Sequence, residues 1–387
     1  MNTSPKKGHI LPIIVFAQFA GTSLWFAGNA VVNDLQIAFN LGENVVGDIT
    51  SAVQSGFIIG TLVFALLSVA DRFSPAKVFL VSTCLGAFFN IAVCLFADSY
   101  FDIMTLRFLT GFFIAGIYPV GMKISADWYS EGLGKALGWL VGALVLGTAF
   151  PHLLKGFSGS LPWQNILFAT SGLTVFGGLI LYFFAGDGPN RKKSSGFDWK
   201  AIFEIFKFKE FRAAAFGYFG HMWELFTFWA FVPLLLTAFD ELQNTQTNVS
   251  FWSFLIIAAG AVGCIVGGYF SEKIGSRKVA FWMLSVSGIC CLISPFIFQT
   301  PQFVFLIFML IWGFTVVGDS PQFSAIIAQT APKKYVGTAL TIVNSIGFAL
   351  TIFSIQLLTF LLRSTEIIWL FPLFVIGPIL GLIALKK

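Results

Sequence analysis

The sequence predicts an all-α membrane protein with twelve transmembrane helices, and its composition and the spacing of its apolar runs indicate this fold class. Of the 387 residues, 57% are hydrophobic and only 11% are charged, whereas a soluble chain is about one quarter charged. So few charges cannot cover a soluble globule of this length, and much of the surface is therefore expected to face lipid. Apolar runs of about 20 residues, the length that crosses a bilayer core, recur along the whole chain.

Each apolar run is expected to form a helix, because backbone N–H and C=O groups in lipid must hydrogen-bond within the segment. The first run follows Lys6 and Lys7. We interpret it as a retained helix and not as a cleaved signal peptide, since it is long enough to span a bilayer and completes an even count. The predicted spans are residues 10–32, 46–70, 77–97, 100–124, 134–155, 163–185, 211–239, 249–270, 279–298, 303–330, 336–362 and 367–385.

The Lys and Arg residues indicate which side of the membrane each loop faces. Twenty of the 23 lie at the two termini or in the loops that follow even-numbered spans, and such an excess marks the cytoplasmic side. Both termini are therefore predicted to be cytoplasmic, and the chain to be a multi-pass protein of the cell inner membrane. The net charge of +5 then reflects topology, and we expect no nucleic-acid partner.

One long polar stretch divides the chain into two halves. We predict an N-terminal six-helix bundle over residues 1–185, a cytoplasmic linker over 186–210 and a C-terminal six-helix bundle over 211–387. Within the linker, residues 199–208 carry aromatic side chains on one face and Lys on the other, which predicts a short interfacial helix.

The two predicted bundles repeat each other. Matching motifs follow the second helix, lie in the fourth and open the fifth helix of each bundle, at offsets of 201, 202 and 203. They are Asp71-Arg72 with Glu272-Lys273, Gly111-Phe112-x-x-x-Gly116-x-x-Pro119 with Gly313-Phe314-x-x-x-Gly318-x-x-Pro321, and Gly134-x-Ala136-Leu137 with Gly337-x-Ala339-Leu340. Two parallel repeats place a binding site at their interface, near the bilayer midplane.

The loop after the eighth span resembles the signature loop of the major facilitator superfamily. It reads Gly268-x-x-x-Glu272-Lys273-x-Gly275-x-Arg277-Lys278, and Asp71-Arg72-x-Ser74-x-x-Lys77 is a degraded copy in the first half. Arg107-x-x-x-Gly111 resembles the family's second motif, and Gly220-His221-Met222-Trp223-Glu224 resembles a branch of cyanate- and nitrate-type permeases. The resemblance implies a bacterial transporter that works by alternating access, with a central cavity lined by the first, fourth, seventh and tenth helices.

The same loops are predicted to act as a gating latch. An acid followed by Arg or Lys at a helix end can bind the unsatisfied backbone groups of neighbouring helix ends, and such contacts can break when the halves move. The alternative is that the basic residues only anchor the topology. The predicted latch residues are Asp71, Arg72, Glu272, Lys273 and Arg277.

Four ionisable residues lie away from the helix ends, where insertion costs about 2.5–3.5 kcal/mol each. They are Arg107, His221, Glu224 and Asp319, in the fourth, seventh, seventh and tenth spans. Glu224 and Asp319 are predicted to exchange the coupling proton, with His221 as its relay. His221-x-x-Glu224 together with Asp319 also has the types of side chain that bind a metal, which we keep as an alternative for the substrate; we predict no resident metal site.

Polar side chains follow one face of the first and tenth spans. Gln18, Thr22, Trp25 and Asn29 are spaced 4, 3 and 4 residues apart, and Thr315 and Gln322 flank Asp319 in the same way. Spacing of this kind places side chains on one helical face. We predict that these residues bind the substrate together with Arg107, whose planar fork suits oxyanions. The alternative for Arg107 is a structural role, in which it pairs with an acid or a helix end and tunes the proton site. Hydrogen bonding between helices is the alternative for Gln18 and Thr22.

The sequence therefore predicts a proton-coupled secondary transporter for a small polar, anionic solute, and not an enzyme. Its expected partners are that solute, protons and membrane lipid. A phosphate-binding loop of the Walker type is missing, so no nucleotide is expected to drive it, and no cofactor is expected. The alternatives are an uncoupled facilitator and an efflux transporter for amphipathic compounds or a metal ion.

Overall fold

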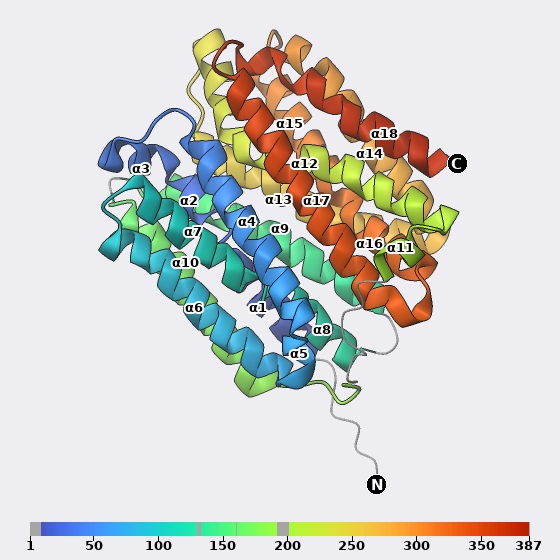
Figure 1. The fold of residues 1–387 in the computed structure, drawn as a ribbon. Coiled ribbons are helices and arrows are strands. Elements are labelled where there is room, and N and C mark those ends of the chain that lie inside the picture. The colour runs from blue at the N-terminus through green and yellow to red at the C-terminus, as the bar shows by residue number, and fades with distance from the viewer. Residues whose placement is uncertain (1–8, 130–132, 160, 192–200, 387) are drawn as a thin grey trace.

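The computed structural model describes residues 9–129, 133–159, 161–191 and 201–386, and these ranges contain helices but no β-strand. Eleven of their helices are long and apolar enough to cross a membrane. Figure 1 shows these helices packed side by side, with the first and last parts of the chain in different groups. The all-helical membrane fold is therefore as predicted.

The first half contains the elements up to residue 185. They are α1 (Ile10–Thr22), α2 (Ala27–Ala30), α3 (Val32–Phe39), α4 (Val45–Leu66), α5 (Val69–Arg72), α6 (Pro75–Phe96), α7 (Tyr100–Ile114), α8 (Tyr118–Trp128), α9 (Leu133–Phe157) and α10 (Gln164–Ile180), which continues as a π-helical turn at Leu181–Ala185.

The second half contains α11 (Ala201–Ile205), α12 (Lys209–Gln243), α13 (Val249–Ile274), α14 (Ser276–Ile297), α15 (Gln302–Gly318), α16 (Ser320–Thr330), α17 (Val336–Leu361) and α18 (Ile376–Lys386), with 3₁₀ turns at Lys333–Tyr335, Ile367–Trp369 and Phe371–Val375. Of the predicted interfacial helix, α11 is observed, whereas Trp199 and Lys200 lie outside the described residues. The exact division at residues 186–210 stays a prediction.

The first transmembrane helix is broken, and the prediction of one continuous helix over residues 10–32 is wrong. α1 ends at Thr22, α2 begins at Ala27, and four residues between them leave the α-helix. The guanidinium of Arg107 donates hydrogen bonds to the carbonyl oxygens of Leu24 and Trp25, at 2.9 Å each. Because a side chain satisfies these carbonyls, the helical hydrogen bonds can be interrupted inside the membrane.

The fourth and tenth helices are each interrupted next to a proline. α7 ends at Ile114 and α8 begins at Tyr118, directly before Pro119. α15 ends at Gly318, and α16 begins at Ser320, directly before Pro321. Proline lacks the N–H that would continue the helix. The tenth helix is therefore interrupted next to Pro321, and the same break recurs next to Pro119 at the matching position of the repeat.

The repeated glycines allow helices to approach closely. A methyl group on Gly111 of α7 would overlap the carbonyl of Val53 in α4, and one on Gly313 of α15 would overlap the carbonyl of Ile256 in α13. Small residues at such crossings let two backbones come into contact. The repeat motif thus has one structural role in both halves, which is to join their second and fourth helices.

The two halves contact each other in the extracytoplasmic part of the membrane. α4 packs against α17, and α9 against α13; Figure 1 shows α4 and α17 passing next to each other. Gln356 donates to Ser51 at 2.9 Å, and Asn248 donates to the carbonyl of Gly156 at 3.2 Å. Both bonds lie near the ends opposite the cytoplasmic termini, so the structure is closed on that side.

Candidate substrate and proton site

An aromatic cluster fills the middle of the interface between the halves. Trp25 and Phe57 come from the first half, and Phe226 and Phe348 from the second. Their ring centroids lie 4.6 Å apart for Phe57 and Phe348, and 5.6 Å apart for Trp25 with either Phe226 or Phe348. All four rings are buried. This aromatic barrier therefore joins the halves and closes the path between them.

Polar ring nitrogens border the aromatic barrier. Phe26 contacts His152 of α9, with centroids 6.5 Å apart, and Trp229 of α12, at 6.3 Å. Among the described residues, the ring nitrogens Nε1 of Trp25, Nε2 of His152 and Nε1 of Trp229 have no hydrogen-bond partner, although all three side chains are buried. Buried polar groups normally have a partner. A polar solute can supply one here.

Arg107 is fully buried inside the first half. Besides its bonds to the broken first helix, it donates to Oδ1 of Asn90 at 2.7 Å. The amide of Asn90 in turn donates to Ser171 at 2.9 Å. The guanidinium therefore supports the break that carries Trp25, and in this conformation the structure shows it behind the aromatic barrier and not beside an open cavity. Its predicted substrate contact stays a prediction.

The structure brings His221 and Asp319 together. Nδ1 of His221 lies 2.8 Å from Oδ1 of Asp319, which is an ion pair when His221 is protonated. Both side chains are buried, and the rings of Tyr218 and Phe323 lie 5.7 and 6.0 Å from the imidazole ring. A proton shared between a carboxyl and an imidazole in an apolar surrounding is a suitable coupling element.

Glu224 has different partners from His221, although it lies one turn further along α12. Its Oε1 accepts hydrogen bonds from Oγ of Ser287 at 2.5 Å and from Nε1 of Trp312 at 2.6 Å. Glu224 is 1% exposed. The carboxyl thus points into the second half, toward α14 and α15.

Arg107 and Glu224 occupy comparable places in the two halves. Arg107 on the fourth helix contacts the third helix through Asn90 and the first through Leu24. Glu224 on the first helix of its half contacts the third through Ser287 and the fourth through Trp312. Each half therefore holds one ionisable group where its first, third and fourth helices meet, and the two groups differ in the sign of charge they can carry.

The other predicted substrate residues are buried and scattered around this region. Thr22 donates to the carbonyl of Gln18 at 2.8 Å, and Asn29 donates to Thr50 at 2.7 Å. Thr315 donates to the carbonyl of Ile311 at 2.9 Å, and the buried Gln322 lies on α16. Of the predicted stripe on the first helix, Trp25 is part of the aromatic barrier. The substrate roles of the others stay predictions.

Two of the five predicted latch residues, Asp71 and Arg277, contact other residues of their own half. Asp71 forms an ion pair with Lys123 at 2.9 Å. Arg277 pairs with Glu210 at 2.8 Å, and its Nε donates to the carbonyl of Leu385, at the end of the last helix, at 3.0 Å. In the described ranges, no hydrogen bond or ion pair is found for the side chains of Arg72, Glu272 or Lys273, and no ion pair joins the halves.

The linker contributes contacts that the sequence did not predict. Arg191 donates to the carbonyls of Asp71 and Phe73, and Asp187 accepts from Ser74 and the backbone N–H of Ala76. The loop between the second and third helices is thus bound to the end of the sixth helix. Arg277 and Leu385 make the matching connection in the second half.

Replacing Glu272 by Gln tests the latch. Because the side chain of Glu272 has no hydrogen bond or ion pair within the described part of the chain, Glu272→Gln should leave the melting temperature of the purified protein unchanged. If Glu272 binds a helix end only when the cytoplasmic side closes, the variant should slow substrate exchange in proteoliposomes several-fold at unchanged equilibrium affinity. An exchange rate equal to that of the wild type would show that the loop only anchors the topology and is not a latch.

The sequence did not predict several of the site residues, because little in the sequence distinguishes them from their neighbours. Asn90 and Ser287 lie in apolar helices that also contain other uncharged polar residues, such as Ser82 and Ser285. Phe226 and Phe348 are two of 48 phenylalanines. His152 lies near the predicted end of its span. An uncharged polar residue in mid-span was the one available signal, and it applied to both Asn90 and Ser287.

In the described part of the chain, no three His, Cys, Asp or Glu side chains come together in a way that can hold a metal ion. His221 and Glu224 do not form a metal site with Asp319, because they have separate partners. His221 pairs with Asp319, whereas Glu224 binds Ser287 and Trp312. A metal substrate has no structural observation in its favour.

An all-helical membrane fold with broken helices and buried ionisable groups near a central interface is typical of secondary transporters. The model of the Major Facilitator Superfamily matches residues 13–355. The chain belongs to this family, whose members are transporters and not enzymes, and it is a multi-pass protein of the cytoplasmic membrane.

Three relatives align with a large part of the chain. A Haemophilus influenzae protein named for metabolite transport is 22% identical over 84% of this chain and 81% of its own length. The "Probable sulfoacetate transporter SauU" of Cupriavidus necator is 25% identical over 82% of this chain and 79% of its own length. The "D-galactonate transporter" of Escherichia coli is 21% identical over 65% of this chain and 66% of its own length.

Proposed function

We propose that this transporter carries a small organic anion and couples its movement to protons. The observation that carries the proposal is a set of three buried ring nitrogens that have no hydrogen-bond partner among the described residues. They are Nε1 of Trp25, Nε2 of His152 and Nε1 of Trp229. Indole N–H groups are donors without acceptor capacity, and imidazole can donate as well. Such a set suits the oxygen atoms of a carboxylate or sulfonate, to which hydrogen bonds are strong.

Two further observations support an anion. Arg107 binds the carbonyl oxygen of Trp25 in the break of the first helix. Its permanent positive charge therefore lies close to Trp25 and favours an anion there. Two of the relatives are named for sulfoacetate and D-galactonate, which are small organic anions. These names suggest the first compounds to test.

Proton coupling is proposed from the second half. His221, Glu224 and Asp319 are all buried there, and ionisable groups inside membrane spans commonly belong to proton relays. The His221–Asp319 pair is proposed to load the proton, and Glu224 to transmit its protonation to α14 and α15 through Ser287 and Trp312. Both acids lie on helices that border the interface.

A thermal stability screen tests the substrate class. The purified protein is heated with sulfoacetate, D-galactonate, the neutral sugar D-galactose or the lipophilic cation tetraphenylphosphonium. A bound anion at 100 times its Kd should add about 2.7 kcal/mol to the free energy of unfolding, while D-galactose should add none. Stabilisation by tetraphenylphosphonium alone would contradict the proposal and favour amphipathic efflux. His152→Phe should weaken the stabilisation by the anion.

A further inference from the structure

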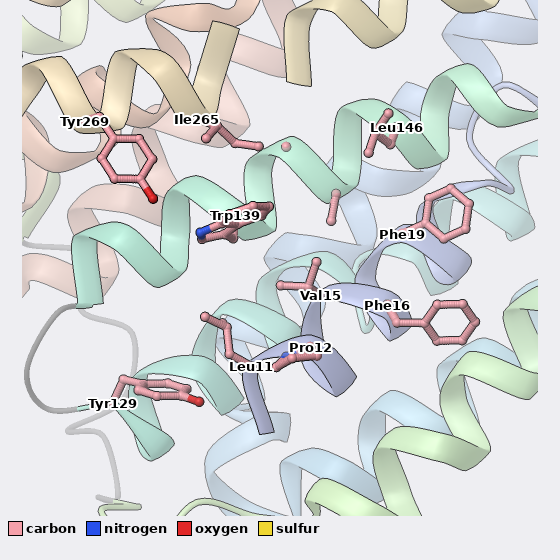
Figure 2. Close-up of a pocket in the computed structure, with 12 residues that line it drawn as sticks. Leu11, Pro12, Val15, Phe16, Phe19, Tyr129, Trp139, Leu146, Ile265 and Tyr269 are labelled. Atoms are coloured by element: carbon pink, nitrogen blue, oxygen red, sulfur yellow. The ribbon is translucent and has the colours of Figure 1, made fainter. Parts of the chain in front are cut away.

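A groove separate from the interface site lies where α1, α9 and α13 meet. It has a cavity volume of about 860 Å³, within the range of about 300–1,000 Å³ that small-molecule sites occupy. Figure 2 shows lining side chains that come from these three helices and Tyr129, directly after α8. Those used below are Phe16, Phe19, Trp139, Leu146, Ile265 and Tyr269.

The groove opens on the outer flank of the helix bundle. Phe16 packs edge-on against Phe176 of α10, with centroids 6.1 Å apart, and Phe176 is 54% exposed. On the other side, Val262 of α13 is 53% exposed. Since α10 and α13 both belong to membrane-length apolar segments, exposed side chains at these positions face the hydrocarbon of the bilayer. The medium in front of the groove is therefore lipid.

The depth of the groove matches the cytoplasmic leaflet. It begins beside Leu11 in the first turn of α1 and beside Tyr269 near the cytoplasmic end of α13, and it extends to Leu146. Leu146 lies thirteen residues into α9, which corresponds to about 20 Å at 1.5 Å per residue. Trp and Tyr are enriched at the level of lipid headgroups, and Trp139 and Tyr269 lie at that end.

The groove also marks where the two halves separate. α9 and α13 touch at Gly156 with Phe251, and again at Gly142 with Ile265. One turn closer to the cytoplasm, a methyl group on Gly138 or Gly268 would meet no atom within 4 Å. The groove follows this divergence, so closing the cytoplasmic side brings its two walls together.

We propose that the groove binds an acyl chain of a phospholipid from the cytoplasmic leaflet, and that the bound chain favours the conformation open to the cytoplasm. A ligand shifts a conformational equilibrium by its difference in affinity for the two states. The acyl chain fits only while α9 and α13 are apart at this end, so it binds one state. The lipid then sets how readily the transporter closes toward the cytoplasm.

Lipid retention tests the site. Leu146→Trp fills the groove, and Leu179→Trp is the matched control, because Leu179 on α10 has nearly the same exposure, 39% against 37%, but does not line the groove. Native mass spectrometry of detergent-purified protein should show retained phospholipid on the wild type and on Leu179→Trp, and several-fold less on Leu146→Trp. Equal retention by all three proteins, or none on the wild type, would overturn the site.

Spin-label distances test the coupling to conformation. Labels at Leu67→Cys and Ile274→Cys, with the five native cysteines replaced, report the separation of α4 and α13 at their cytoplasmic ends. Adding phosphatidylglycerol to delipidated protein should increase the long-distance population, and Leu146→Trp should show no lipid-dependent change. If phosphatidylglycerol leaves the distance distribution of the labelled protein without the Leu146→Trp change unaltered, the coupling is overturned. Displacement of the lipid by tetraphenylphosphonium that is then transported would make the groove a substrate entrance instead. Neither measurement depends on the substrate proposed above.

Discussion

The Glu224→Gln protein is expected to lose pH-driven accumulation of substrate while it still exchanges substrate across the membrane. Gln keeps the oxygen that accepts from Ser287 and Trp312 but cannot ionise, so it imitates the protonated state. With one coupled proton, a pH difference of one unit supplies about 1.4 kcal/mol, enough for about tenfold accumulation. The variant should show none of this in proteoliposomes with labelled sulfoacetate or D-galactonate, whichever stabilises the wild type.

Asp319→Asn separates the two acids. It removes the charge that faces His221 and leaves the Glu224 contacts intact. If the pair loads the proton and Glu224 transmits it, both variants should lose accumulation and keep exchange. Loss of accumulation in Asp319→Asn alone would assign proton coupling to the His221–Asp319 pair and not to Glu224. Normal accumulation in both variants would make the protein an uncoupled facilitator.

Arg107→Met is expected to destabilise the protein even without substrate. The carbonyls of Leu24 and Trp25 and the Asn90 side chain would lose their donor, and an unsatisfied buried group costs about 1–3 kcal/mol. A clear fall in melting temperature and almost complete loss of transport should follow. The measurement is thermal unfolding of the purified variant with and without the stabilising anion.

Arg107→Lys is the matched control for charge. It keeps the positive charge but cannot reproduce the planar fork, so it should recover only part of the stability. An Arg107→Met protein that melts like the wild type, but is no longer stabilised by the anion, would make Arg107 a substrate ligand and not a support of the broken helix.

The helical fold and its repeat were predictable because they depend on patterns that are local in the sequence. Runs of apolar residues, basic loops and matched motifs such as those around Gly111 and Gly313 are visible without knowledge of contacts. The break in the first helix was not predictable, because it depends on a donor 83 residues away, from Arg107 to Leu24. The break at Pro321 was predictable, since proline acts on its own helix.

The candidate site was predictable in its residue types but not in its pairings. The sequence alone identified four ionisable residues within apolar helices, which are Arg107, His221, Glu224 and Asp319. Helical spacing suggested that His221 and Glu224 act together, yet the structure pairs His221 with Asp319 and directs Glu224 to Ser287. Which neighbour a side chain meets is decided by the packing of distant helices, and a single sequence does not contain that information.

The most direct test of the central claim is the movement of protons with the anion. Wild-type proteoliposomes containing the pH dye pyranine, with the membrane potential clamped, receive sulfoacetate or D-galactonate, whichever stabilises the protein. The account predicts a change in internal pH that requires the anion, is missing with D-galactose and disappears in Glu224→Gln. Uptake of the labelled anion by the wild type without any change in internal pH would contradict it.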